Sequence, residues 1–257
     1  AGTISWHKSM QDAVDAASTT QPSTITIWKE IVKEGSEITI NGKEMTITSK
    51  NPMIYTIDGN AMHRGFYITN GSSVTLSKIN IVNCRIPDLV SYFVNGGGIY
   101  LDAGSHLMLN EVMVTNCSAI GAFGNAGGGI YVTNGTLTVL NSIISNNTAL
   151  TGGGIAAVSS TLVLDDHSLI WANSAQSGSA LFLSTMLPSV IRYCTFEANA
   201  LPGGTGAIHL LHCPNITIHS NEIRNNIDGG IFIQGTTTVK NRDSLDWLAV
   251  DSPPFNI

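Results

Sequence analysis

Short runs in which apolar and polar residues alternate recur along most of the chain. Residues 136–139 read Thr-Leu-Thr-Val, and residues 215–218 read Asn-Ile-Thr-Ile. Such alternation is typical of β-strands that bury one face, because successive side chains in a strand point to opposite sides. Glycine, asparagine and β-branched residues are too frequent in these runs for α-helix. The pattern therefore predicts many short strands separated by turns.

Two motifs repeat with one common period. Gly-Gly-Gly-Ile and its weaker echoes occur at residues 96–99, 127–130, 152–155, 179–181, 206–208 and 229–231. Between them recurs an apolar residue followed, three positions later, by asparagine or cysteine. The last members of this second motif are Cys84, Cys117, Asn147, Asn173, Asn199 and Asn226, at spacings of 33, 30, 26, 26 and 27 residues. A period of this size predicts a solenoid in which each repeat forms one coil.

We expect an all-β fold, a right-handed, single-stranded parallel β-helix (a β-solenoid) with a short N-terminal capping helix. Each strand then pairs in parallel with its equivalent one coil away, about 4.8 Å distant, so equivalent residues stack. A polar side chain that points inward at a turn must hydrogen-bond its own copies up the stack, as asparagine amides can. The repeated asparagines and cysteines are therefore expected to form a structural ladder, and the glycines to allow tight coil corners.

Both ends of the chain depart from the repeat. Ser9 can cap a short helix in which Met10, Ala13, Val14 and Ala17 lie on one face. A solenoid needs such a cap to cover its open core. We predict a single domain over residues 1–257, with an N-terminal cap at 1–23, coils at 24–242 and a C-terminal tail or cap at 243–257.

Charge and composition argue against several classes of protein. Only 12% of residues are charged, the net charge is −6 and the 12 basic residues are scattered, so we expect no nucleic-acid partner. The chain contains no run of about eighteen apolar residues, so we expect no membrane insertion by this segment. The four cysteines form no Cys-x-x-Cys pair and no zinc spacing with histidine, so we expect no metal site and no cofactor.

Several motifs resemble a known group of proteins. They are Gln-Asp-Ala-Val-Asp-Ala-Ala at residues 11–17, Ile-Thr-Ile-Asn-Gly-Lys-Glu-Met-Thr-Ile at 38–47, Asp-Gly-Asn at 58–60, two copies of Gly-Gly-Gly-Ile-Tyr, and Asn-Asn-Thr-Ala at 146–149. Over about residues 9–240 the chain resembles right-handed β-helix domains of bacterial and archaeal surface proteins. Phe-Glu-Ala-Asn at 196–199 is similar to a unit of polymorphic outer membrane proteins. The resemblance implies a secreted or cell-surface location, and the same fold also serves polysaccharide lyases and hydrolases.

One coil carries an acidic turn that is one residue longer than its neighbour. Aligning residues 161–173 with 136–147 places the extra residue at Asp165, Asp166 and His167. A bulge often re-aims side chains near a site, and paired carboxylates suit Ca²⁺ binding or acid–base chemistry on a sugar. A solvated, aspartate-rich turn has the same sequence pattern, so both interpretations stay open.

Arg192 and His219, in the next two coils, extend the candidate catalytic set. Arginine and histidine can each act as the base of a lyase. Alternatively, Arg192 forms a cross-strand ion pair with Asp166 in the preceding coil. Of the four motifs that the resemblance to pectin-cleaving hydrolases would bring, only Asp-Asp at residues 165–166 is present.

Two pairs of residues in neighbouring coils each leave two structural interpretations open. Tyr100 and Tyr131, one coil apart, could form an aromatic strip for sugar binding or a stack inside the core. Cys84 and Cys117 take equivalent places in neighbouring coils, where Cα atoms about 5 Å apart allow a disulfide. Two stacked free thiols fit the same sequence.

The sequence supports two functions. The missing catalytic motifs, the low charge and the resemblance favour a non-catalytic, adhesive or ligand-presenting surface module, with a host surface protein or a glycan as partner. Its contact surfaces would be the insertions at residues 85–95 and 118–126. The alternative is a polysaccharide-active enzyme, a lyase or a hydrolase, with a groove along the coils around Asp165, Arg192 and His219. Ca²⁺ would be the cofactor of that enzyme.

Overall fold

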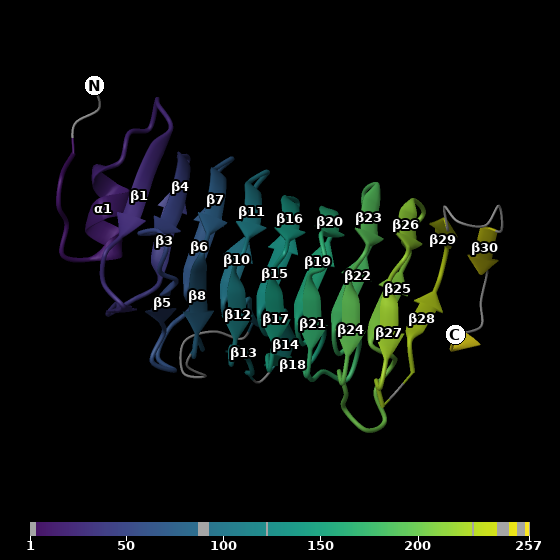
Figure 1. Cartoon of the computed structure of the whole chain (residues 1–257). Helices are drawn as coiled ribbons and strands as arrows, with labels where there is room; N and C mark the ends of the chain where they lie inside the picture. The colour runs from purple at the N-terminus through teal and green to yellow at the C-terminus, as the bar shows by residue number, and fades with distance from the viewer. Residues whose placement is uncertain are drawn as a thin grey trace.

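The computed structural model describes residues 4–86, 93–121, 123–227, 229–240, 247–250 and 255–256. Within these residues, strands stack coil upon coil into an elongated parallel β-solenoid, and a short helix, α1 (Met10–Ala16), lies near the N-terminal end (Figure 1). The predicted parallel β-helix with a short N-terminal helix is confirmed. Along each regular coil the chain passes through the three sheets C, A and B defined below, as in β15, β16 and β17.

Three long sheets run along the solenoid. Sheet A contains β1 (Ser23–Ile27), β4 (Glu44–Ser49), β7 (Ser73–Ser77), β11 (His106–Asn110), β16 (Thr136–Leu140), β20 (Thr161–Asp165), β23 (Ser189–Arg192), β26 (Ile216–His219), β29 (Thr237–Lys240) and β30 (Trp247–Val250). Sheet B contains β2 (Ile31–Lys33), β5 (Tyr55–Asp58), β8 (Ile79–Val82), β12 (Met113–Thr115), β17 (Ile143–Ser145), β21 (Leu169–Trp171), β24 (Thr195–Glu197) and β27 (Glu222–Arg224). Sheet C contains β3 (Ile38–Asn41), β6 (Phe66–Thr69), β10 (Ile99–Leu101), β15 (Ile130–Thr133), β19 (Ile155–Val158), β22 (Leu181–Ser184), β25 (Ile208–Leu211), β28 (Ile231–Gln234) and β31 (Phe255–Asn256). Two short pairs, β9 (Phe93–Asn95) with β14 (Phe123–Ala126) and β13 (Ser118–Ala119) with β18 (Thr148–Ala149), lie at the turns between sheets B and C.

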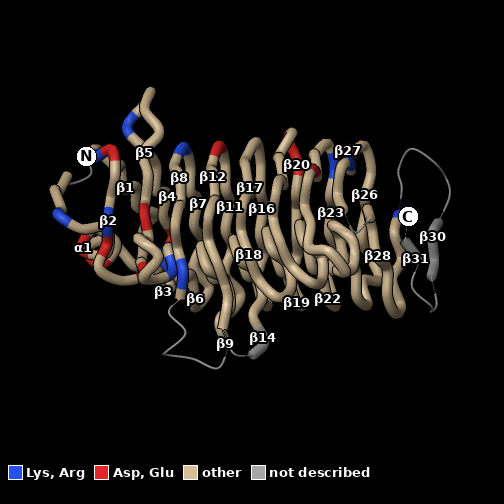
Figure 2. The backbone as a smooth tube through the Cα atoms, turned by 90° about the horizontal axis from the view of Figure 1, so that it is seen from below, with Lys and Arg blue, Asp and Glu red and all other residues tan. Residues whose placement is uncertain are grey.

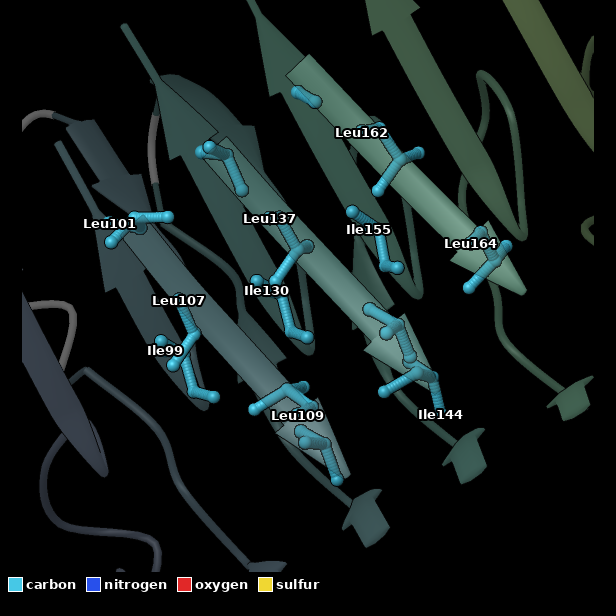
Figure 3. Packing of buried hydrophobic residues seen from close by; sticks show 14 of the residues in the cluster. Ile99, Leu101, Leu107, Leu109, Ile130, Leu137, Ile144, Ile155, Leu162 and Leu164 are labelled. Carbon is cyan, nitrogen blue, oxygen red and sulfur yellow. The ribbon is translucent and has the colours of Figure 1, made fainter. Parts of the chain in front are cut away.

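Alternate residues of the strands point inward and form one continuous core. Leu107, Leu137 and Leu162 occupy equivalent places in three consecutive strands of sheet A, and Ile99 and Ile130 do so in sheet C (Figure 3). All five side chains are at most 2% exposed. Burying one such side chain contributes about 1.5–3 kcal/mol, so the repeat is stabilised chiefly by this core.

Helix α1 covers the N-terminal end of the core. The Ser9 hydroxyl accepts a hydrogen bond from a first-turn N–H, as an N-cap does, and Met10 and Val14 are buried in the main hydrophobic cluster. The Gln11 side chain accepts from Thr39 N–H at 2.7 Å and donates to Thr39 O at 3.1 Å. Gln11 thus satisfies backbone groups at the edge of β3 that a preceding coil would otherwise pair.

Antiparallel strands follow the last coil. β30 pairs with β29 and β31 with β28, both antiparallel, so the parallel stacking does not continue through them. Residues 241–246, 251–254 and 257 lie outside the described residues, as do 87–92 and 122 in the predicted contact insertions. The division of the chain into one domain with a C-terminal tail or cap at 243–257 therefore stays a prediction.

Asparagine side chains form a buried ladder at the turn after sheet B. The backbone N–H and the Nδ2 of Asn147 both donate to Asn173 Oδ1, at 3.0 and 3.1 Å. Asn173 donates in the same way to Asn199, and Asn199 to Asn226. At the other end of the ladder, Cys117 N–H donates to Asn147 Oδ1 at 2.9 Å.

The four cysteines are buried free thiols, so Cys84 and Cys117 form no disulfide. Burial and its neighbour Cys84 raise the pKa of the Cys117 thiol well above its usual value. Cys194 and Cys213 occupy other turns, where their N–H groups donate to Asn221 Oδ1 and Thr237 Oγ1. The cysteines therefore act here as small packing residues within polar turn ladders.

Candidate functional site

Asp165, Arg192 and His219 lie in one outward column of sheet A. Asp165 ends β20, and Arg192, at the end of β23, pairs in register with His219 at the end of β26. The Arg192 Nε and Nη2 atoms lie 2.7 and 2.6 Å from Asp165 Oδ2. The expected ion pair of Arg192 with Asp166 is therefore wrong. Asp165 is the last residue of its strand and takes the place beside Arg192, whereas Asp166 already belongs to the turn.

Asp166 and His167 lie on the exposed turn that follows β20. Two residues, 141–142, connect sheets A and B in the preceding coil, whereas three, 166–168, do so here, which confirms the predicted insertion. Asp166 and His167 both have positive φ, of 53° and 58°, and their side chains are 61% and 85% exposed. The insertion therefore directs these two side chains into solvent.

The carboxylate of Asp165 is held in its ionised form. Partial burial raises its pKa, but the hydrogen bonds from Arg192 and from the Asp166 N–H, together with the charge of Arg192, outweigh burial and leave the pKa below its ordinary value. A general acid for sugar cleavage needs a raised pKa. Asp165 therefore fits a structural ion pair better than an acid catalyst.

A groove of about 310 Å³ opens along this column. It is lined by Val190, Arg192, Thr217, His219 and Lys240. His219 is 6% exposed, and its ring packs edge to face against Tyr193, with ring centroids 5.7 Å apart. Of the predicted catalytic residues, the structure thus brings Asp165, Arg192 and His219 together and leaves the other two on the neighbouring turn.

Tyr67, Tyr100 and Tyr131 form an outward column on sheet C. They pair in register in β6, β10 and β15. The ring centroids of Tyr67 and Tyr100 are 5.4 Å apart, and those of Tyr100 and Tyr131 are 5.2 Å apart. All three side chains are partly exposed on the outer face, so they are not a core stack. Tyr67 was not expected from the sequence, because its coil lacks the Gly-Gly-Gly-Ile motif that marked the other two.

Charged groups flank the tyrosine column. The Arg64 guanidinium carbon lies 5.0 Å from the Tyr100 ring centroid, and its Nη1 forms a 2.6 Å ion pair with Glu37 Oε2. Asp102 Oδ2 accepts a hydrogen bond from the Tyr67 hydroxyl at 3.2 Å, while its buried Oδ1 has no hydrogen-bond partner among the described residues. Burial first, and then Tyr131 and the charge of Asp102, raise the pKa of Tyr100 to about 12. Its hydroxyl therefore remains a hydrogen-bond donor at neutral pH.

The same column continues, after one alanine, as Phe182, His209 and Phe232. The His209 ring stands edge to face with both phenylalanines, at centroid distances of 5.1 and 4.7 Å. The Ser177 hydroxyl lies 2.5 Å from His209 Nδ1, and Gln234 Oε1 lies 3.2 Å from Nε2. Because the Gln234 oxygen only accepts, Nε2 carries the proton and Nδ1 accepts from Ser177.

The column of sheet A and the tyrosine column both fall within the region matched by one protein family. The family model described as a right handed beta helix region matches residues 64–244, which is more than half of the chain. The chain belongs to the right-handed β-helix family. The searches among curated proteins and among solved structures give no match. Because this β-helix fold serves adhesins and polysaccharide-active enzymes alike, membership of the family does not choose between them.

The described part of this β-helix offers neither a cluster of metal ligands nor a membrane-spanning helix. Among the residues that the structure describes, no three His, Cys, Asp or Glu side chains are grouped so that they could hold a metal ion. In that same part of the chain, no helix has the length and hydropathy to cross a membrane. The expectations about cofactors, partners and location stay predictions.

His209 is expected to make the β-helix less stable in mild acid. Burial lowers its pKa below 6.5, against the smaller opposing effect of the Gln234 hydrogen bond. The folded state thus favours the neutral ring. The contribution of the neutral His209 ring to the free energy of unfolding is fully present above the unfolded pKa, near 6.5, and is lost as the pH falls through the folded pKa.

Urea unfolding at pH 7.5 and 5.5 should show this loss of stability in the wild type and a smaller loss in His209→Gln. The control His106→Gln, at an exposed position of sheet A, should keep the wild-type dependence; equal dependence in all three would contradict the assignment.

Proposed function

We propose that this β-helix is a non-catalytic, secreted or cell-surface module that adheres to a glycan through the outer face of sheet C. The adhesin-like relation to surface proteins, including polymorphic outer membrane proteins, belongs to the same proposal. Its support is the column of three outward tyrosines, one per coil in consecutive coils. Sugar rings bind to aromatic faces through their C–H groups, and a column of rings along the solenoid suits a linear chain of sugars.

The polar groups beside the tyrosines suit sugar hydroxyls. Asp102 Oδ1 is buried without a hydrogen-bond donor among the described residues, which costs about 1–3 kcal/mol. A small rotation of the Asp102 side chain would bring this oxygen to the surface, where a hydrogen bond from a ligand hydroxyl would remove the cost. The Tyr100 hydroxyl, protonated at neutral pH, can donate to a second sugar oxygen. The face thus offers an aromatic surface, an acceptor and a donor within one patch.

Loss of the Tyr100 ring is expected to weaken glycan binding about fivefold, since an aromatic contact contributes about 1 kcal/mol. A glycan array probed with the full chain would identify the ligand, and titration of that glycan would compare Tyr100→Ala with Tyr131→Ala and the wild type. Tyr193→Ala is the matched control, because Tyr193 is 49% exposed but lies at the turn after β23. Binding that survives both column variants, or that only Tyr193→Ala weakens, would exclude the sheet C face.

The second candidate is a polysaccharide lyase or hydrolase in the sheet A groove. The grouping of Asp165, Arg192 and His219 beside a groove of about 310 Å³ is the observation that favours it. The test is the absorbance of unsaturated product from uronic-acid polymers, with and without Ca²⁺, and reducing-end release for a hydrolase. We expect no turnover. Turnover that is lost in Asp166→Ala or His219→Ala would replace the adhesive function with the enzymatic one.

A further inference from the structure

Two of the turns between sheets B and C project from the solenoid, and the depression between them is called the notch below. The first is the turn that holds residues 118–121 and 123–126, and the second is the turn at 200–205, which projects between β24 and β25 (Figure 1). In the two coils between them, the same turn is short, at 148–151 and 174–177. The notch therefore spans three coil spacings, roughly 14 Å at about 4.8 Å per coil. In Figure 2, the chain at β9 projects beyond the row of coils.

The lining of this notch is mainly apolar and carries no charge. Ala119 and Ala149 lie in a small buried cluster separate from the main core, and Ile120 and Leu150 remain 45% and 41% exposed. Leu201 lines the side formed by the second loop. The notch is an open depression of about 360 Å³, within the usual size range of ligand sites, and none of the described residues that line it is charged.

Asn125 gives the notch one buried polar group. The residue is 6% exposed, and its Nδ2 donates to Gly121 O at 2.5 Å. Its Oδ1 has no hydrogen-bond donor among the described residues. A Cβ built on Gly121 would lie 3.1 Å from Asn125 Oδ1, so Gly121 lies directly beside this oxygen. Because glycine has no side chain, only its backbone atoms cover the oxygen on that side. A buried acceptor without a donor costs about 1–3 kcal/mol, which a bound N–H group would offset.

We propose that the notch binds a short, extended and uncharged segment of another polypeptide. An apolar side chain of this segment lies against Ile120 and Leu150, and a backbone N–H donates to Asn125 Oδ1 after a small shift of Gly121. A peptide offers an apolar side chain and an amide donor side by side, as this lining requires. The described lining residues include no aromatic ring for a sugar and no charge for an acidic or basic ligand. One extended chain with its side chains needs about 10 Å, which the notch provides.

The test uses the full chain and an array of capped, uncharged octapeptides in which apolar residues alternate with serine, threonine or glutamine. Parallel peptides carry lysine or aspartate at the apolar positions. We expect the uncharged peptides alone to bind, and Leu150→Asp to weaken binding at least tenfold. Ile120→Asp repeats the test should Leu150→Asp fail to fold. The control is Ile143→Asp, because this isoleucine is 39% exposed in sheet B of the same coil as Leu150 and should leave binding unchanged.

An N-methyl scan of the best peptide tests the hydrogen bond to Asn125. Methylation at one backbone nitrogen should weaken binding about threefold to tenfold, the contribution of one hydrogen bond. Absence of peptide binding, or binding that Leu150→Asp and Ile120→Asp leave intact, would refute the peptide site. The peptide site would also be refuted if the chain formed a dimer that Leu150→Asp and Ile120→Asp dissociate. The same holds if the chain bound neutral oligosaccharides and these variants abolished that binding. Tyr100→Ala should not change peptide binding, so this site and the glycan face can fail separately.

Discussion

Replacing Asn173 with leucine is expected to lower the free energy of unfolding by about 4 kcal/mol. Asn173 Oδ1 accepts two hydrogen bonds from Asn147, and Asn173 Nδ2 donates to Ile144 O at 2.8 Å and to Asn199 Oδ1 at 3.0 Å. Leucine has a similar volume but no polar atoms. Its neighbours would therefore keep buried donors and acceptors without partners, which is costlier than losing the bonds alone.

Urea unfolding followed by circular dichroism measures this loss. The matched control is Asn215→Leu, because Asn215 is exposed in the turn just before β26 and its replacement should change stability by no more than about 0.5 kcal/mol. Equal stability of the two variants would show that the ladder hydrogen bonds do not hold the coils together.

Replacing Gly152 with alanine is expected to cost about 3 kcal/mol. Gly152 has φ +59°, and a Cβ there would lie 2.5 Å from the Ile155 carbonyl oxygen and 2.7 Å from Ala156 Cβ. The corner of the coil therefore combines a left-handed backbone with a close approach of the strand that follows. Backbone must move to admit a methyl group, and each shift disturbs the stacking on the two neighbouring coils.

Gly71→Ala separates the two causes. Gly71 has φ +68°, but nothing lies within 4 Å of a Cβ built there, so only the backbone preference opposes alanine. We expect about 1 kcal/mol for this variant. A similar cost for both variants in urea unfolding would mean that the close approach at Gly152 contributes nothing.

The repeat made the fold predictable. In a solenoid, each coil meets nearly the same neighbours, so the same constraint appears in the sequence once per coil. The asparagines at 147, 173 and 199 and the glycines at 127 and 152 recur for this reason. The short helix was predictable from Ser9 and two apolar positions, because its cap and buried face are local features.

Contacts that depend on the exact residue at which a strand ends were not predictable from the sequence. A strand that ends at Asp165 places that residue, and not Asp166, beside Arg192, and the sequence alone does not reveal this end to one residue. The buried serine ladder at the turn between sheets A and B, in which Ser142 N–H donates to Ser168 Oγ at 3.3 Å, was also missed, because serine is common throughout the chain. Small polar residues carry little positional signal unless the register is known.

The candidate sites were only partly predictable for a similar reason. Tyr100 and Tyr131 stood out through the motif that precedes them, whereas Phe182, His209 and Phe232 fall in the same column without such a mark. The notch at Asn125 arises from differences in turn length between coils that lie several tens of residues apart. Such differences become a surface only when the coils are stacked.

Oxidative cross-linking tests the stacking of coils most directly. Thr138→Cys and Val163→Cys would place thiols at partner positions of β16 and β20, at a Cα separation that allows a disulfide. The native cysteines should not interfere, since all four are buried and burial raises the pKa of Cys194 to about 12. We predict rapid disulfide formation in this pair and none between Thr138→Cys and Thr217→Cys, three coils apart in the same column. Cross-linking of the distant pair, or failure of the adjacent pair alone, would contradict the β-helix and every site derived from it.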